Sequence, residues 1–435
     1  MRRRTAVSAV VVGIVFLLVA VAAYYTTAVD RAAARLEQAV VDQVDPLSAS
    51  IEAAQRRLTD VPGDYRTWAQ LGSAYVEQAR VTADPTYYDK ADGALRESLV
   101  LRAEGNDAAL TGQGALANAR HDFAAAAGLA EQALAINPYN ATAWGVLTDA
   151  RTQLGNYPGA TEALGRMLAL NPGLASFTRA SYDAELHGDL PAARAALEQA
   201  LDSTQGGAAE AFCRTYLGAL AFSTGDLDEA EAQYAAGLDA RPGDAALMLG
   251  RARVLTARGQ WAAAEEAFRA VVDAQPLPEH LVEYGEFLQA QGRVDDAQQQ
   301  FALVGTVGEL FAASGATDDL TTALFAADHG DPSEAVAAAQ TEFDRRQNVD
   351  SHDALAWALH SAGRDAEALP HAVQSTALGG RNALFLYHRG VIEAAVGQID
   401  QARATLALAL ATNPHFSPLH APRAEELLTS LGGRP

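Results

Sequence analysis

A period of about 34 residues runs through most of the 435-residue chain, and it constrains the fold more than any other feature. The prolines Pro138 and Pro172 are 34 residues apart, and so are Pro242 and Pro276. Glycines follow the same period in steps of 33 to 38 residues: Gly155, Gly188, Gly225, Gly259, Gly292, Gly330, Gly363 and Gly397. A repeat of this length is one supersecondary unit that buries its apolar face only by stacking on its neighbours.

The residues within each period have helical spacing. Trp68, Leu71 and Tyr75 fall on one stripe of a predicted helix, and Ala91 and Leu95 fall on a stripe of the next. Apolar residues three or four positions apart lie on one face of an α-helix. Each unit is therefore predicted to be two antiparallel helices, A and then B, joined by a short turn.

The turns between these helices carry helix-capping residues. In the segment GDPSEA, Asp331 can cap a helix, Pro332 fits its first turn and Glu334 can complete a capping box. Asp189 and Asn156 stand at the same place in other repeats. These polar residues are predicted to be structural.

The pattern resembles the tetratricopeptide repeat, whose signature the segment WAQLGSAY at Trp68–Tyr75 matches in full. The resemblance implies an all-α solenoid, a right-handed superhelix of about ten helix-turn-helix repeats over 62–428. A half-repeat helix at 47–61 would precede the array, and 429–435 would form a tail. Segments such as DLTTALFAADHG also resemble an exported, membrane-anchored bacterial family of such repeats, for which no activity is assigned.

The N-terminus predicts a membrane anchor. Residues 6–25 carry no charge, and at about 1.5 Å per residue they match a hydrocarbon core of about 30 Å. The arginines within 1–5 place that end in the cytoplasm, with a partly helical linker at 26–46 and the array outside. The alternative is a signal peptide cleaved after Ala22, which would release a secreted protein.

Composition argues against several function classes. The 54 acidic and 32 basic residues give a formal net charge of −22, which disfavours nucleic acid as a partner. The single cysteine, Cys213, can form neither an internal disulfide nor a multi-cysteine metal site. No sequence motif for nucleophilic or metalloprotease chemistry is found. We therefore expect a non-enzymatic protein without a cofactor.

Histidines leave a second hypothesis open. Seven of the ten lie beyond residue 328, and His360 and His388 fall on the A helices of adjacent repeats. Metal sites need side chains that converge, and these two could face one groove. The alternative to a scaffold is thus an accessory protein that binds a metal or small ligand through these repeats.

The leading hypothesis is a membrane-tethered scaffold that binds a protein or peptide of the cell envelope in its concave groove. Stacked helix pairs form such a groove mainly from their A helices. Projection of the repeat places these residues on it: Asp149, Gln153, Tyr182, Glu185, Phe222, Arg253, Glu286, Gln289, Trp357, His360, Tyr387 and His388.

Overall fold

The structure is a computed structural model that describes residues 46–82, 84–313 and 319–434. These residues form 22 helices and no strand. The predicted transmembrane segment at 6–25, with the n-region at 1–5 and the linker as far as residue 45, lies outside the described residues. Among the helices that are described, none combines the length and the apolar character that crossing a bilayer requires.

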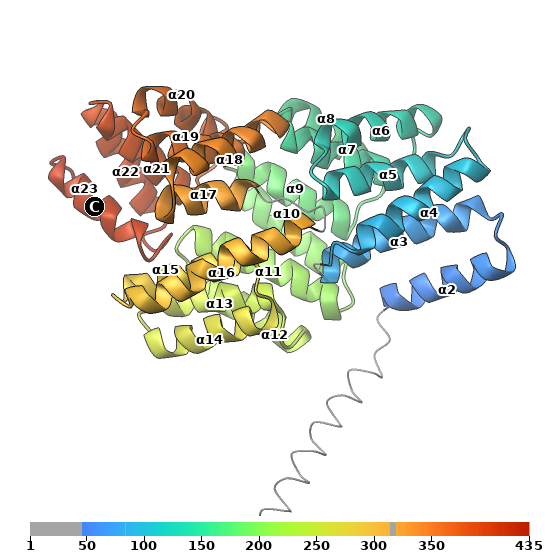
Figure 1. Ribbon diagram of the computed structural model, residues 1–435, viewed down its shortest axis with the longest axis horizontal. Helices are drawn as coiled ribbons and strands as arrows, with labels where there is room; N and C mark the ends of the chain where they lie inside the picture. The colour runs from blue at the N-terminus through green and yellow to red at the C-terminus, as the bar shows by residue number, and fades with distance from the viewer. Residues whose placement is uncertain (1–45, 83, 314–318, 435) are drawn as a thin grey trace, which may run out of the picture. The chain divides into compact units, whose positions relative to one another are not determined.

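The chain divides into two compact units, Met1–Pro62 and Gly63–Pro435. The described helix of the first unit is α2 (Pro46–Asp60), where the sequence predicts a half-repeat helix. The described part of the second unit contains ten helix pairs followed by α23 (His420–Ser430), which supports the predicted helix-turn-helix array (Figure 1).

The A helices of the ten pairs are α3 (Tyr65–Thr82), α5 (Asp107–Ala119), α7 (Ala141–Gln153), α9 (Leu174–Leu186), α11 (Gly207–Ser223), α13 (Ala245–Ala257), α15 (Pro278–Ala290), α17 (Asp319–His329), α19 (Val349–Ser361) and α21 (Ala383–Ala395). The B helices are α4 (Tyr87–Leu101), α6 (Phe123–Ile136), α8 (Tyr157–Leu170), α10 (Leu190–Asp202), α12 (Leu227–Ala240), α14 (Trp261–Ala274), α16 (Val294–Ala313), α18 (Pro332–Arg345), α20 (Asp365–Ser375) and α22 (Ile399–Thr412).

The predicted caps are confirmed. The side chains of Asn156, Asp189 and Asp331 accept hydrogen bonds from backbone N–H groups in the first turns of α8, α10 and α18. Each bond satisfies one of the donors that a helix N-terminus leaves free. The caps therefore fix where each of these B helices begins.

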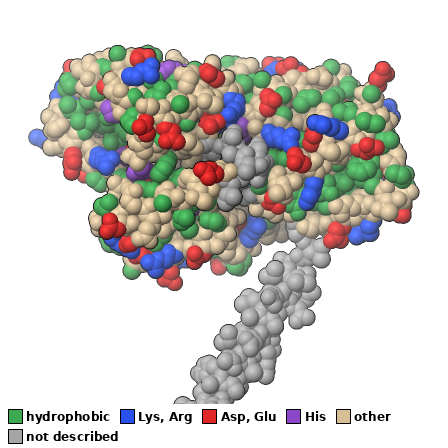
Figure 2. Space-filling view, in the orientation of Figure 1, with side chains coloured by type: hydrophobic (Ala, Val, Ile, Leu, Met, Phe, Trp, Pro, Cys, Tyr) green, Lys and Arg blue, Asp and Glu red, His purple; other side chains and the backbone are tan. Residues whose placement is uncertain are grey.

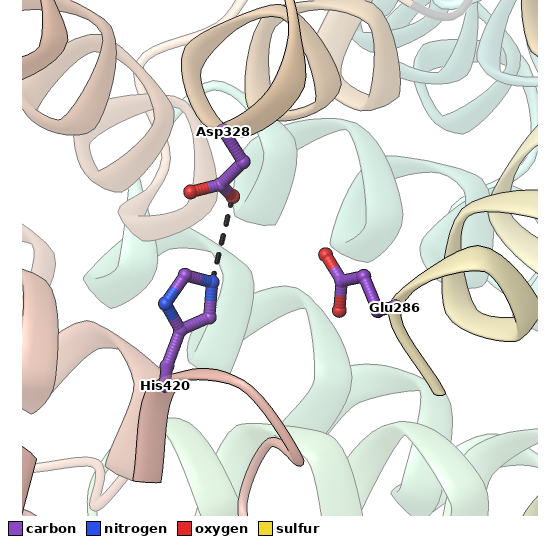
Figure 3. A group of neighbouring side chains, drawn as sticks. All are labelled: Glu286, Asp328 and His420. Carbon is purple, nitrogen blue, oxygen red and sulfur yellow. Dashed lines mark ion pairs between the residues drawn. The ribbon is translucent and has the colours of Figure 1, made fainter. Parts of the chain in front are cut away.

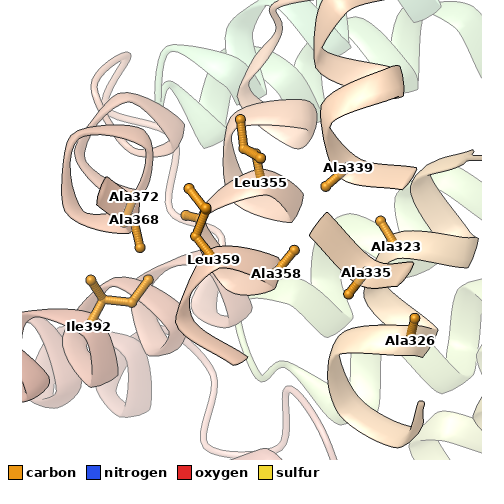
Figure 4. Close-up of a cluster of buried hydrophobic side chains, with 11 residues drawn as sticks. Ala323, Ala326, Ala335, Ala339, Leu355, Ala358, Leu359, Ala368, Ala372 and Ile392 are labelled. Carbon is orange, nitrogen blue, oxygen red and sulfur yellow. The ribbon is translucent and has the colours of Figure 1, made fainter. Parts of the chain in front are cut away.

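Small residues let the A and B helices of a repeat approach closely. In four repeats a glycine of helix A faces a large side chain of helix B, at a spacing that an added Cβ would not tolerate. The pairs are Gly72 with Leu95, Gly218 with Tyr234, Gly285 with Phe301, and Gly390 with Leu406. Alanines are buried together in the core of the eighth and ninth repeats, among them Ala326, Ala335 and Ala358 (Figure 4).

Within the unit Gly63–Pro435 the array bends back, so that repeats distant in sequence touch. The Tyr157 hydroxyl accepts a 2.8 Å hydrogen bond from the backbone N–H of Val349, which is 192 residues further on. Asn413 Nδ2 donates a 2.9 Å bond to the carbonyl of Phe222, 191 residues earlier. Figure 1 shows the start of α8 beside the end of α18. We call these contacts the seam: the turns near 155, 188 and 225 meet the loops at 346–350, 379–380 and 413–414.

Candidate functional site

Several of the residues predicted to line the groove are paired across neighbouring A helices. Arg179 makes a bidentate contact with Asp149, at 2.7 Å and 2.6 Å. Arg253 Nε donates a 2.7 Å bond to Glu283. Bidentate guanidinium–carboxylate pairs fix both partners geometrically. These charges therefore tie adjacent repeats together.

Gln153 meets the seam instead of open solvent. Its side-chain carbonyl accepts bonds from Arg346 Nη1 at 2.7 Å and from Asn348 Nδ2 at 2.8 Å. The backbone carbonyl of Phe222 accepts a hydrogen bond from Asn413 Nδ2. In these repeats the chain itself contacts residues predicted to bind a partner, and the physical reason is that the array winds tightly enough to touch itself.

Tyr182 and Glu185 lie on the same stretch of the seam, close to Asp350. Burial raises the pKa of Glu185, and the charge of Asp350 raises it further. Burial also raises the pKa of Asp350, although the charge of Arg346 partly offsets this. The pKa of the Tyr182 hydroxyl is raised by desolvation and by the same carboxylate, although the residue as a whole is 41% exposed. The negatively charged forms of these three side chains are thus disfavoured at this point of the seam.

A buried ion pair lies beside these groups. The Arg346 guanidinium contacts the Glu342 carboxylate, and their side chains are only 9% and 1% exposed. The guanidinium also lies 5.6 Å from the ring centroid of Phe123, in the second repeat. Arg346 therefore connects three repeats through an ion pair, a hydrogen bond and a cation–π contact.

Two turn glycines fit against backbone across the seam. Gly155 and Gly188 have φ angles of 75° and 76°, and a Cβ on either would collide with the carbonyl of Gln347 or Gly379. Both the left-handed conformation and the close approach favour glycine. The turn glycines Gly225, Gly259, Gly292, Gly363 and Gly397 share the positive φ angle without such a close backbone contact, whereas Gly330 does not have a positive φ angle.

The structure differs from the prediction at Trp357, Tyr387 and His388, which are 7%, 4% and 1% exposed. The sequence predicts exposed groove residues here, but Trp357 and Tyr387 belong to a core that joins the last repeats to α23, and His388 lies against Trp357. Trp357 stacks on His388 with ring centroids 4.0 Å apart. Burial raises the pKa of Tyr387 to about 12. Aromatic side chains on the inner face are buried here because α23 packs against them.

The predicted pair His360 and His388 does not converge on one another. His388 Nδ1 lies 2.9 Å from Asp353 Oδ2, and His360 Nδ1 lies 2.5 Å from Asp365 Oδ1. Each histidine thus has its own carboxylate partner. The two rings do share Trp357, on which both stack.

Another group of side chains does converge. One ligand atom each of Glu286, Asp328 and His420 lies within 4.8 Å of the others, and the three come from α15, α17 and α23 (Figure 3). Burial raises the pKa of Asp328, but the charges of His420 and His388 and a hydrogen bond from Trp357 together hold it below its usual range. Of these three residues, the predicted groove contained only Glu286. Gln289, one turn further along α15, has a buried side-chain oxygen without a hydrogen-bond partner.

Sequence reasoning missed the residues on the far side of the seam, namely Arg346, Asn348 and Asn413. Asn348 also caps α19, so its place before a helix was readable. Its contact with Gln153, 195 residues earlier, depends on how far the superhelix turns per repeat. No local motif carries that information.

The helix pairs, their period and their close A–B packing define an α-solenoid of helix-turn-helix repeats. Family models described as tetratricopeptide repeat match residues 117–177, 179–245, 216–278 and 249–304. These residues form tetratricopeptide repeats, as the sequence signature indicated. No curated protein shows significant similarity to it.

Several solved structures are similar to this chain at low identity. A tetratricopeptide repeat protein from Parabacteroides merdae is 19% identical, and the match covers 59% of this chain and 98% of that one, with a TM-score of 0.35. A thermophilic TPR protein of Thermus thermophilus is 23% identical over 43% of this chain and 99% of that one, with a TM-score of 0.38. The human IFIT1 dimer with PPP-AAAA is 16% identical, over 86% and 93%, with a TM-score of 0.47.

Proposed function

We propose that the protein is a non-enzymatic scaffold, tethered to the cytoplasmic membrane by residues 6–25, that binds a protein partner of the cell envelope. Arrays of this repeat commonly bind other proteins through surfaces that extend over several repeats. The seam occupies part of the concave face. The partner is therefore proposed to bind where apolar side chains remain exposed.

The observation that carries this proposal is a row of exposed apolar residues on the first three repeats. Leu101, Ile136 and Leu170 are the last residues of three successive B helices, α4, α6 and α8. They are 41%, 44% and 38% exposed, and their neighbours Val100 and Tyr139 are each 79% exposed. Green side chains gather over this end of the array in Figure 2. We call these five residues the apolar row.

The apolar row ends where the fourth repeat begins. The next B helices, α10, α12 and α14, end in Asp202, Ala240 and Ala274. Equivalent positions of successive repeats recur on the same side of the array. The apolar row therefore marks one side of the first three repeats, and exposed apolar surface gathered in this way is typical of an interaction site.

The test is a pull-down from envelope extract with the full-length protein as bait. The double variant Ile136→Ser/Tyr139→Ser removes the centre of the apolar row, and Val294→Ser/Ile399→Ser is the matched control. Val294 and Ile399 are 54% and 39% exposed and lie on other repeats. We expect a stoichiometric partner that the control retains and the row variant loses, with binding weakened about tenfold or more.

Retention of the partner by both variants would contradict the apolar row as its binding site. If neither the wild type nor the control captures any partner, the result contradicts the scaffold proposal itself. The tether is tested separately by fractionation. Full-length protein should sediment with membranes and a variant lacking residues 1–29 should not, whereas a soluble full-length protein would contradict the anchor.

A further inference from the structure

Three side chains from distant parts of the array meet at the cluster of Glu286, Asp328 and His420. Glu286 lies on α15, Asp328 on α17 and His420 begins α23. Figure 3 shows the carboxylates and the imidazole directed toward a common point. We propose that these residues bind one divalent cation of the zinc class, which ties α23 to the seventh and eighth repeats. This goes beyond the proposed scaffold function and does not depend on it.

The geometry suits such an ion. Zinc bonds to histidine nitrogen and carboxylate oxygen at about 2.0–2.2 Å, so ligand atoms of a tetrahedral site stand about 3.4 Å apart. His420 Nε2 lies 3.6 Å from Asp328 Oδ2, which is too long for a hydrogen bond but close to that spacing. The remaining ligand atom lies within 4.8 Å of these two. A contraction of at most about 1.4 Å completes three bonds and leaves a fourth position for water.

The histidine is not satisfied by ordinary hydrogen bonds within the part of the chain that the structure describes. The His420 side chain is 4% exposed, and its Nδ1 atom has no hydrogen-bond partner among the described residues. Its Nε2 atom is directed at the two carboxylates and lies 3.6 Å from Asp328 Oδ2. A buried imidazole without a proper hydrogen bond costs free energy unless something else satisfies it. A cation between Nε2 and the carboxylates would do so.

Each of the two carboxylates is oriented by a further polar contact. Trp357 Nε1 donates a 3.0 Å hydrogen bond to Asp328 Oδ1, so that Oδ2 is left to face His420. His329 Nε2 lies 3.2 Å from Glu286 Oε1, and the His329 side chain is 7% exposed. Ligating carboxylates in metal sites are oriented by hydrogen bonds of this kind.

Aromatic rings enclose the cluster. The ring centroid of Tyr387 lies 5.1 Å from that of His420, and His329 stacks on Phe301 at 4.3 Å. The Glu286 and Asp328 side chains are only 16% and 15% exposed. An apolar shell limits access of water and strengthens the attraction of two buried carboxylates for a cation. Because one donor is imidazole, the set favours zinc over magnesium or calcium, which prefer oxygen donors alone.

The experiment is a zinc titration of chelator-treated full-length protein by calorimetry, followed by thermal melting with and without the ion. The variants Glu286→Gln and Asp328→Asn remove one ligand each and keep the side-chain volume. His415→Gln is the matched control, because His415 is exposed and lies five residues from His420. Magnesium serves as the control ion.

We expect one zinc ion per chain, a melting temperature raised by about 3 °C or more, and binding weakened at least about tenfold in both ligand variants. The control variant should bind like the wild type. Failure of the wild type to bind zinc more tightly than about 1 mM would overturn the proposal, and so would equal binding by the ligand variants. Should a variant not fold, anomalous diffraction from zinc-soaked wild-type crystals decides: an ion bonded to all three residues supports the site, and an ion elsewhere overturns it.

Discussion

The turns of the third and fourth repeats and those of the sixth and seventh have the same local structure in different surroundings. Gly155 and Gly188 have φ angles of 75° and 76°, and Gly259 and Gly292 have φ angles of 68° and 75°. Around Gly155 and Gly188 the backbone of a distant repeat leaves no room for a Cβ atom. Around Gly292 nothing lies within 4 Å, and at Gly259 the nearest atom is 3.9 Å away.

This difference separates two levels of structure. The local conformation is set by the helix-turn-helix unit, which needs a left-handed residue between its helices. The close approach is set by the winding of the whole array, which brings the turns near 155 and 188 onto loops about 190 residues later. A turn glycine in this array is thus either a local requirement alone or also a contact of the seam.

The largest expected effect comes from the buried ion pair at the seam. Arg346→Met removes the guanidinium and leaves the Glu342 carboxylate buried, with Arg345 as its remaining ionic partner. Breaking a buried pair in this way costs about 3–5 kcal/mol of unfolding free energy. The control is Arg364→Met at an exposed pair with Glu367, where no measurable loss is expected. Urea denaturation of both variants measures the difference, and equal losses would contradict the seam's role.

The glycines give the second effect. Gly292→Ala should cost about 1–2 kcal/mol, because alanine is strained in the left-handed conformation. Gly188→Ala carries the same strain and also forces the backbone near Gly379 apart, for about 1–3 kcal/mol more. Small-angle scattering should show expansion for Gly188→Ala alone. Identical stability and size for the two variants would remove the distinction between the two kinds of turn.

A smaller effect is expected at Tyr157. The variant Tyr157→Phe removes the acceptor of the Val349 N–H, a part-buried bond across the seam, at a cost of about 1–2 kcal/mol. Tyr139→Phe is the control, since Tyr139 is 79% exposed and should lose nothing measurable. Hydrogen exchange of the Val349 amide should accelerate in the first variant only. Unchanged protection would mean that this bond does not hold the seam.

The last effect is a dependence on pH. The pKa of Glu185 is raised above its ordinary value of 4.5, so its contribution to stability is full below pH 4.5 and is lost as the pH rises through the folded pKa. The variant Glu185→Gln has no ionisable group at this position, so it does not lose stability as the pH rises. The variant should be more stable than the wild type at pH 7, and the difference should disappear below pH 4.5. At the exposed residue Glu367 the pKa is lowered by Arg364, so Glu367→Gln should not stabilise the protein at pH 7.

The repeat itself could be predicted from the sequence because its causes are local. The period, the caps at Asn156 and Asp331, and the glycines at A–B contacts all act within one or two units, and the structure contains each of them. The tight approach of Gly218 to Tyr234 is an example of a pairing that spacing alone indicates.

The seam and the inner core could not be predicted in the same way. A projection of the repeat places Trp357 and Gln153 on the concave face, but it does not say what that face meets. Whether Trp357 faces solvent or α23 depends on how the helix after the last repeat folds onto the repeats before it. Whether Gln153 meets Arg346 depends on small rotations between repeats that add up over five of them. Such rotations arise from packing between units, which no short motif records.

The central claim, that the array closes on itself, is tested most directly by one distance in the full-length protein. Spin labels at Pro158→Cys and Gln347→Cys mark the two sides of the seam on exposed positions. Burial raises the pKa of Cys213 to about 11, so the native thiol stays protonated and unlabelled. A closed array predicts one narrow distribution near the spacing of neighbouring helices, about 10 Å plus the length of the labels. A broad distribution centred near about 50 Å, the span of five stacked repeats in an open solenoid, would contradict the account.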